Sequence, residues 1–170
     1  MNATLLRTVM MAASLAAGAS PAHAHGDNKP APAAPAAAEQ TDWGIADTAA
    51  RPARTISIAM SDTMRFMPDR ISVQAGDSVR FVVRNNGRML HEMVIGTPDS
   101  LARHAATMAR FPDMQHDEAY MAHVEPGKTG EIVWHFNRAG RFAFGCLIAG
   151  HYEAGMHGTL TVTPMKGTEK

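Results

Sequence analysis

Residues 141–163 read RFAFGCLIAGHYEAGMHGTLTVT, and apolar side chains alternate with other residues at both ends of this stretch. Phe142, Phe144 and Cys146 fall on one face of an extended chain, and the closing GTLTVT shows the same alternation. A period of two residues is typical of β-strands with one buried face. The stretch therefore predicts two strands, joined by a loop that contains two glycines.

The same alternation recurs upstream, in TISIAM (55–60), SVRFVV (78–83) and EIVWHF (131–136). Turn signals separate these segments: QAGD at 74–77, NNGR at 85–88, EPGKTG at 125–130 and NRAG at 137–140. Many short strands with glycine-rich turns are typical of an all-β sandwich or a small barrel. We therefore predict one all-β domain over residues 53–165, followed by a tail at 166–170.

One segment, TPDSLARHAATMARFP, departs from the strand pattern. Thr97 is suited to an N-cap, Pro98 to the first helical position, and Pro112 lies beyond the end. We predict a short helix followed by a loop. This excursion lies between the strand of His91 and the strand that starts near Thr129.

The N-terminal region predicts export. Arg7, the apolar run VMMAASLAAGA and the Ala22-His23-Ala24 motif form a signal peptide over residues 1–24, cleaved after Ala24. The run is too short for a membrane span, so we expect a periplasmic protein with no such span. Residues 25–52 are rich in Pro and Ala, which predicts a flexible tether. An ordinary cytosolic N-terminus is the alternative.

Charge and cysteine content narrow the classes of function. The chain carries 16 Lys and Arg against 16 Asp and Glu, which gives no electrostatic reason to expect a nucleic acid partner. The single cysteine cannot form a disulfide within the chain. In an oxidising compartment a lone thiol is a liability unless something occupies it, and a metal ion would.

Four residues together suggest which metal. Cys146, His151 and Met156 are spaced along one loop, and His91 lies on an apolar strand, where a buried imidazole needs a partner. Two imidazoles, one thiolate and a weak axial thioether form a trigonal blue-copper site. Each residue alone has an ordinary structural interpretation in a core, but the combination favours copper.

These residues resemble the cupredoxins, which have an upstream histidine and a Cys-His-Met loop. The loop spacing is similar to that of rusticyanin and auracyanin. The stretches 64–96 and 145–162 resemble most closely the plastocyanin/azurin-like periplasmic proteins of copper-tolerance operons, the CopI type. The resemblance covers about residues 54–164. It implies a Greek-key β-sandwich with one type 1 copper, and it implies that the copper ligands are His91, Cys146, His151 and Met156.

One position departs from the family pattern. Many cupredoxins have Asn or Ser directly after the first histidine ligand, where it helps to hold the cysteine loop, but this chain has Glu92. A carboxylate beside a copper–thiolate centre can change its potential or geometry. A distorted, green-type site is therefore an alternative to the ordinary blue one.

Two further groups of residues are candidate copper sites. One is a Met/His cluster in the excursion: Met108, Met114, His116, Met121 and His123. Its thioethers suit Cu(I), and its alternative interpretation is helix packing beside a solvated loop. The other is His25, which would become the mature N-terminus and offer an amine and an imidazole. Its alternative is a residue in a disordered tail.

The leading hypothesis for function is a monomeric periplasmic copper protein that cycles between Cu(II) and Cu(I). It would serve copper tolerance or one-electron transfer to a partner such as a cytochrome or an oxidase. The alternative is a copper chaperone or sequestration protein that uses the Met/His loop 108–123 and works with other copper-handling proteins. An oxygen-reducing copper enzyme would need histidines beside the cysteine, where Gly145 and Leu147 stand. We therefore expect that the protein is not an enzyme. Weak cuprous oxidase activity at the single copper centre is the alternative.

Overall fold

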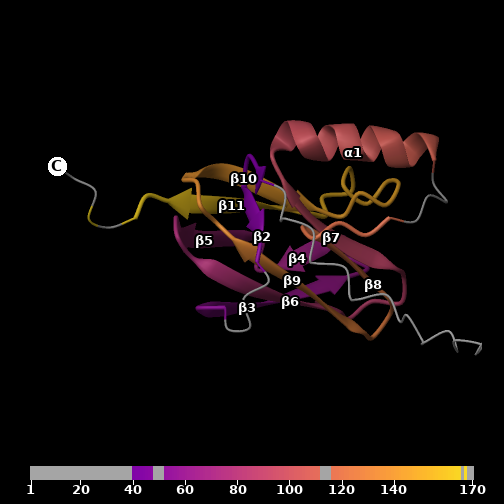
Figure 1. Ribbon diagram of the computed structural model, residues 1–170. Coiled ribbons are helices and arrows are strands. Elements are labelled where there is room, and N and C mark those ends of the chain that lie inside the picture. Colours follow the sequence, from indigo (N-terminus) through magenta and orange to yellow (C-terminus); the bar gives the residue numbers. More distant parts are fainter. Residues whose placement is uncertain (1–39, 48–51, 112–115, 166, 168–170) are drawn as a thin grey trace, which may run out of the picture. The chain divides into compact units, whose positions relative to one another are not determined.

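The computed structural model describes residues 40–47, 52–111, 116–165 and 167. The predicted signal peptide, His25 and Met114 lie outside these residues. The described residues form two β-sheets and one helix (Figure 1). The prediction of an all-β sandwich is confirmed. No helix in the described part of the chain has the length and apolar character that crossing a membrane requires.

The two sheets are mixed. The six-stranded sheet has the order β1 (Gln40–Thr41), β2 (Gly44–Ala46), β9 (Thr129–His135), β6 (Ser78–Asn85), β3 (Arg54–Ser61) and β4 (Arg65–Met67). The five-stranded sheet has the order β5 (Arg70–Gln74), β11 (His157–Thr163), β10 (Gly140–Gly145), β7 (His91–Gly96) and β8 (Met121–Val124). The pairs β3–β6 and β5–β11 are parallel, and the other strand pairs are antiparallel.

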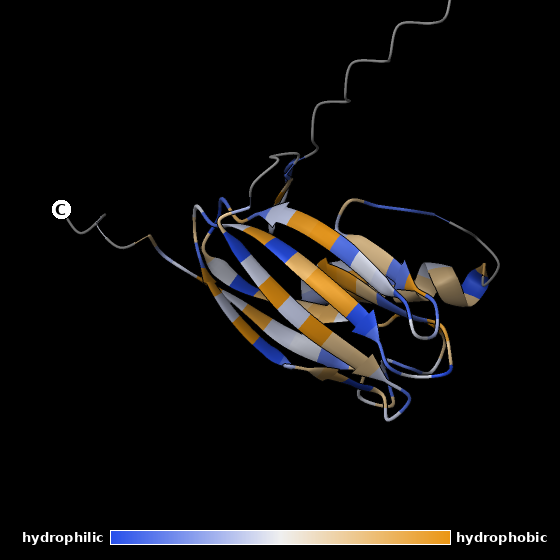
Figure 2. Cartoon of the chain, turned by 90° about the horizontal axis from the view of Figure 1, so that it is seen from below, coloured by the Kyte–Doolittle hydropathy of each residue, from blue (hydrophilic) through white to orange (hydrophobic). Residues whose placement is uncertain are grey.

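Alternating side chains from both sheets form a common core. Val79, Phe81 and Val83 of β6 are fully buried. Arg84, the residue after Val83, is exposed. Phe144 of β10 belongs to the same core cluster. Figure 2 shows the resulting alternation of hydrophobic and hydrophilic residues along the strands. The period of two in the sequence therefore sets which face of each strand points inward.

Strand β7 is buried on both faces, and this positions the site. Met93 and Ile95 pack in the core between the sheets. Val94 points the other way and packs with Leu101 of α1 (Pro98–Arg110), which lies along this side of the sheet (Figure 1). The predicted N-cap of this helix is confirmed, because the Thr97 hydroxyl accepts a hydrogen bond from the Ser100 N–H at 3.0 Å.

The second half of the excursion differs from the sequence prediction. Residues Met121–Val124, predicted as loop, form the edge strand β8 and pair antiparallel with β7. In this register Glu92 stands opposite His123. The strand has only four residues, of which Met121 and Val124 are buried, so its pairing depends on β7 and leaves almost no periodic signal in the sequence.

The predicted tether 25–52 is wrong for residues 40–47. Strands β1 and β2 form a short hairpin, and β2 pairs with β9. Trp43 is buried at 8% exposure, stacks on Trp134 and meets the Tyr120 ring edge-on. The Trp134 indole N–H donates to the Trp43 carbonyl at 3.1 Å. One buried tryptophan creates no periodic pattern, which is why the composition alone suggested a tether.

Candidate metal centre

Three predicted ligands meet at one end of the five-stranded sheet. The ligand atoms of His91, Cys146 and His151 all lie within 4.8 Å of one another. His91 begins β7, Cys146 directly follows β10, and His151 lies on the loop between β10 and β11. Because β7 and β10 are paired neighbours, the sheet itself brings the first two donors together.

His91 has the environment of a metal ligand. Its side chain is fully buried, and Nε2 lies 3.1 Å from Asp62 Oδ1. The other ring nitrogen, Nδ1, is buried and has no hydrogen-bond partner among the described residues. A buried polar atom without a partner is costly, and a metal ion at Nδ1 would satisfy it. A carboxylate on the far nitrogen is a common way to orient a ligating imidazole.

Cys146 is a fully buried thiol beside a second imidazole. Its Sγ lies 3.2 Å from His151 Nδ1 and accepts the Glu92 backbone N–H at 3.5 Å. Burial raises the pKa of the thiol to about 12, although backbone N–H groups of Glu92 and Ile148 act in the opposite direction. Without a metal the sulfur is therefore a protonated thiol at neutral pH, and a bound cation is what would hold it as thiolate.

The loop between β10 and β11 closes on itself through its backbone. The Met156 N–H donates to the His151 carbonyl, and the Cys146 N–H donates to the Met156 carbonyl, both at 3.0 Å. Met156 is fully buried in the same core cluster as Cys146. Gly150 and Gly155 have φ of 84° and 100°, which glycine adopts without strain. The loop thus brings a buried thioether back to the cysteine.

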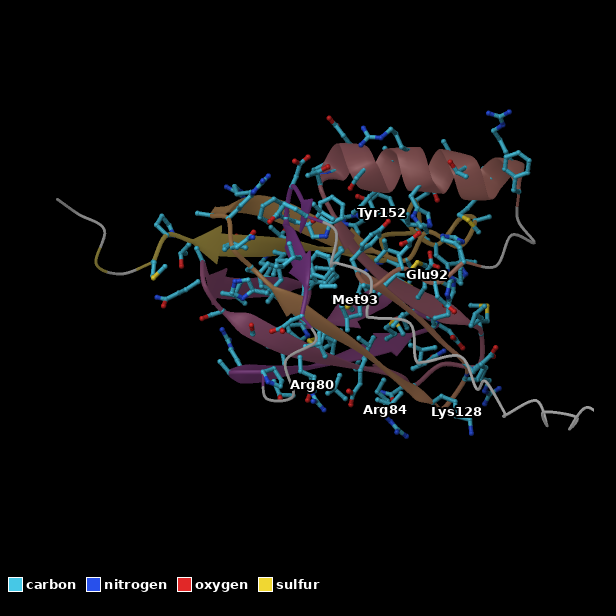
Figure 3. The ribbon with its side chains drawn as sticks, viewed as in Figure 1. Arg80, Arg84, Glu92, Met93, Lys128 and Tyr152 are labelled. Atoms are coloured by element: carbon cyan, nitrogen blue, oxygen red, sulfur yellow. The ribbon has the colours of Figure 1, made fainter. Side chains whose placement is uncertain are left out.

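Glu92 holds the cysteine loop. Its side chain is 2% exposed, and Oε1 accepts the Leu147 N–H at 2.7 Å. Oε2 lies 2.8 Å from His123 Nε2. Burial raises the Glu92 pKa, and the Leu147 N–H and His123 oppose this shift. Figure 3 shows Glu92 and Tyr152 on the side of the sheet where α1 lies. Glu92 therefore makes the kind of contact that the resemblance assigned to Asn or Ser.

The predicted Met/His cluster is only partly brought together. His116 and His123 are neighbours, with ring centroids 6.2 Å apart. Met121, in contrast, is buried in an apolar cluster with Leu101 and Leu147. Met108 lies half-buried on α1. The structure therefore gathers imidazoles at this place, while the Met121 thioether packs in the apolar cluster.

Two residues of these sites were missed by the sequence reasoning. Asp62, which contacts His91, lies in a turn between β3 and β4, 29 residues upstream of its partner. His104 of α1 lies with its Nε2 3.0 Å from His116 Nε2. Neither residue stands in a ligand-like spacing along the chain, and only the fold brings it to its partner.

The fold and the donors together define a class of protein. A thiolate, two imidazoles and a buried thioether are the donors of a trigonal copper site, and the β-sandwich supplies them from β7 and the β10–β11 loop. The orphaned His91 Nδ1 shows that these residues fit a bound ion. The molecule is thus a cupredoxin-like copper-binding protein.

Comparison with known families gives the same assignment. Residues 53–163 match the family described as copper binding proteins, plastocyanin/azurin family. The chain belongs to this family. The predicted cofactor, copper, is confirmed at this level.

Similar proteins are known by sequence and by structure. A copper-resistant cuproprotein CopI from Rubrivivax gelatinosus is 51% identical over 122 residues, 72% of this chain and 74% of that protein. A protein of the same description from Pseudomonas aeruginosa is 35% identical over 87% of this chain and 88% of its own length. The solved structure of auracyanin B is similar with a TM-score of 0.58 and 26% identity, over 75% of this chain and 99% of that one. The predicted resemblance to the CopI type is confirmed.

Proposed function

We propose that this protein is a periplasmic type 1 copper protein that serves copper tolerance by cycling one copper ion between Cu(II) and Cu(I). The observation that carries the proposal is the convergence of Cys146 Sγ, His151 Nδ1 and a buried His91 whose Nδ1 has no other partner. The description of the relatives as copper-resistant cuproproteins supports the physiological role.

The chain's contribution is to hold the donors in place. Asp62 orients His91, the Glu92 N–H contacts the sulfur, and the Glu92 carboxylate fixes the next peptide of the loop. Bound copper would supply one-electron chemistry, with soft donors for Cu(I) and imidazoles that suit both oxidation states. Donors fixed by the fold need little rearrangement when the charge of the ion changes.

His151 is the ligand through which we expect electrons to pass. It is partly exposed, whereas His91 and Cys146 are fully buried. Exposed apolar residues lie on the same loop and on the turn before β7: Ala149, Ala154, Met89 and Leu90. Leu147, on the same loop, is buried and does not contribute to this surface. A redox partner such as a cytochrome or an oxidase would dock here, with the protein as carrier and not as enzyme.

The test is the visible and EPR spectrum of the mature protein with one equivalent of Cu(II). We expect an intense thiolate-to-copper band in the wild type and its loss in Cys146→Ser. His135→Gln is the matched control, because His135 contacts Ser78 on β6 and not the site. A pale spectrum of nitrogen and oxygen ligation, identical in all three proteins, would refute the proposed centre.

Two further experiments separate this function from the alternatives. A buried four-donor site should release copper slowly to a Cu(I) chelator, whereas a chaperone or sequestration protein should release it readily. For localisation, we expect the protein in the periplasmic fraction, with His25 as the first residue by N-terminal sequencing. Recovery in the cytosol with an intact N-terminus would contradict the proposed export.

A further inference from the structure

Three histidines gather on the outer side of β7, apart from the proposed copper ligands. His104 comes from α1, His116 from the segment before β8, and His123 from β8. His104 Nε2 and His116 Nε2 lie 3.0 Å apart, and their ring centroids 4.8 Å apart. The His123 ring lies edge-on to His116 with centroids 6.2 Å apart. Three separate elements thus present imidazoles to one place.

The facing nitrogens of His104 and His116 are spaced almost as two ligands of one ion. With metal–nitrogen bonds of about 2.0 to 2.1 Å, two ligands of a tetrahedral ion lie roughly 3.3 Å apart, close to the observed 3.0 Å. Burial lowers the pKa of His104, and His116 and His123 add to the shift. The neutral imidazole, which is the form that binds metal, is therefore favoured.

A buried carboxylate stands beside this cluster. Glu92 Oε2 lies 2.8 Å from His123 Nε2, and the Asp117 carboxylate lies 3.7 Å from His123 Nδ1. Both carboxylates contact His123, and carboxylate oxygens beside an imidazole favour a cation over a neutral occupant. The same Glu92 accepts the Leu147 N–H, one residue after Cys146. The cluster is therefore connected to the loop of the copper centre by two hydrogen-bonded contacts.

We propose that His104, His116 and His123 form a second metal site for a divalent ion that prefers imidazole ligands, with Cu²⁺ as the ion that the protein meets. His104 and His116 provide the facing pair, and His123 would be the third ligand through Nδ1, because its Nε2 contacts Glu92. The donors are nitrogen atoms and not the predicted thioethers, and imidazole ligands suit Cu²⁺ and Zn²⁺. It lies on the excursion, outside the His91, Cys146 and His151 centre.

Copper stoichiometry in the full mature chain tests this site. We expect the wild type to bind one more equivalent of Cu²⁺ than the double variant His104→Gln/His116→Gln, measured by equilibrium dialysis and metal analysis. The additional ion should give an EPR signal with nitrogen ligation that the double variant lacks. His135→Gln is the matched control and should bind as many ions as the wild type. Any copper held at His25 is common to all three proteins and cancels.

The thiolate band gives an internal control for folding. The double variant should keep this band, because none of the three histidines is a ligand of that centre. The single variant His104→Gln is the milder test, and we expect it to weaken binding of the additional equivalent at least about tenfold. Equal stoichiometry and equal affinity in all proteins would overturn the second site, whether or not the thiolate band is present. Loss of that band alone would instead count against the proposed function.

Discussion

Two of the proposed donors of the copper centre, His91 and Cys146, are each held by a second contact from the chain. His91 is oriented by Asp62, and the Cys146 sulfur accepts the Glu92 N–H. Leu147, the next residue along, donates to the Glu92 carboxylate. Residues that ligate no metal thus fix the ligands, and their substitution should change potential or stability without removing the ion.

Copper binding should release a proton from Cys146. Burial raises the pKa of the metal-free thiol to about 12, so the thiol is protonated at neutral pH and must lose its proton to bind. The apparent affinity for Cu(II) should therefore increase with pH, about tenfold per unit between neutral pH and that pKa. Calorimetric titration in buffers of different ionisation enthalpy measures the released proton. Cys146→Ser should release none, and a pH-independent affinity in the wild type would contradict the expectation.

Asp62→Asn should raise the reduction potential. The Arg88 N–H holds the pKa of Asp62 below its usual value, and His91 contributes, so the carboxylate is charged at neutral pH. A negative charge beside His91 stabilises Cu(II) over Cu(I). The rise should stay below the roughly 59 mV of a tenfold one-electron change, because solvent screens a surface carboxylate.

Redox titration measures the effect of Asp62→Asn. Asp77→Asn is a suitable control, because the Asp77 carboxylate accepts the Gln74 N–H in the β5–β6 turn and contacts no ligand. A lower or unchanged potential in Asp62→Asn would contradict the expected stabilisation of Cu(II) by the carboxylate.

Glu92→Ala should destabilise the metal-free protein more than Glu92→Gln. Both variants lose the carboxylate beside His123, but Gln keeps an acceptor for the Leu147 N–H. Leaving a buried donor unpaired costs about 1 to 3 kcal/mol. Urea denaturation of the two variants measures the difference in the free energy of unfolding. Equal losses would mean that the hydrogen bond to the loop contributes little.

At the scale of elements, the two faces of β7 contribute residues to two different sites. His91 points into the space shared with Cys146 and His151, and Glu92, one residue later, points toward α1 and β8. Adjacent residues of a strand face opposite sides of the sheet. A single strand therefore connects the copper centre with the histidine cluster of the excursion.

The β10–β11 loop should tolerate substitution at Gly150 better than at Gly155. Both have positive φ, so alanine at either costs about 1 kcal/mol or more. A Cβ at Gly150 would meet no atom within 4 Å, whereas at Gly155 it would collide with the Arg65 guanidinium. That group donates to the Ala154 carbonyl at 2.8 Å. We expect Gly155→Ala to lower both thermal stability and copper affinity further than Gly150→Ala, and equal effects would contradict this.

At the scale of the whole domain, the hairpin 40–46 completes the six-stranded sheet. It pairs with β9 and places Trp43 against Trp134 and Tyr120. Tyr120 directly precedes β8, the edge strand of the five-stranded sheet. Trp43 therefore supports the edge at which the histidine cluster lies. Residues 40–46 are therefore part of the folded unit.

Trp43→Ala should lower the free energy of unfolding by about 3 to 5 kcal/mol, the usual range for removing a buried large aromatic side chain. Met67→Ala is the matched control, because Met67 is 72% exposed and its removal should change stability by no more than about 0.5 kcal/mol. Chemical denaturation followed by fluorescence measures both. A loss of less than about 1 kcal/mol in Trp43→Ala would show that the hairpin is only loosely attached.

The sequence by itself determined the strand pattern, the excursion with its N-cap Thr97, and the loop that spaces Cys146, His151 and Met156. These features are local: side chains alternate along one strand, and a cap lies within a few residues of its helix. The upstream candidate His91 followed from its place on an apolar strand, and the resemblance implied the same ligand role. The family match agrees with the copper protein that the resemblance implied.

Only the tertiary structure decided which distant residues meet. It brought Asp62 to His91, His104 to His116, and Trp43 to Trp134, although 29, 12 and 91 residues separate them. It also turned the predicted loop 121–124 into a strand, because β7 offered a partner edge. Such contacts depend on how strands and the helix pack together, and packing between distant segments leaves no periodic signal in the chain.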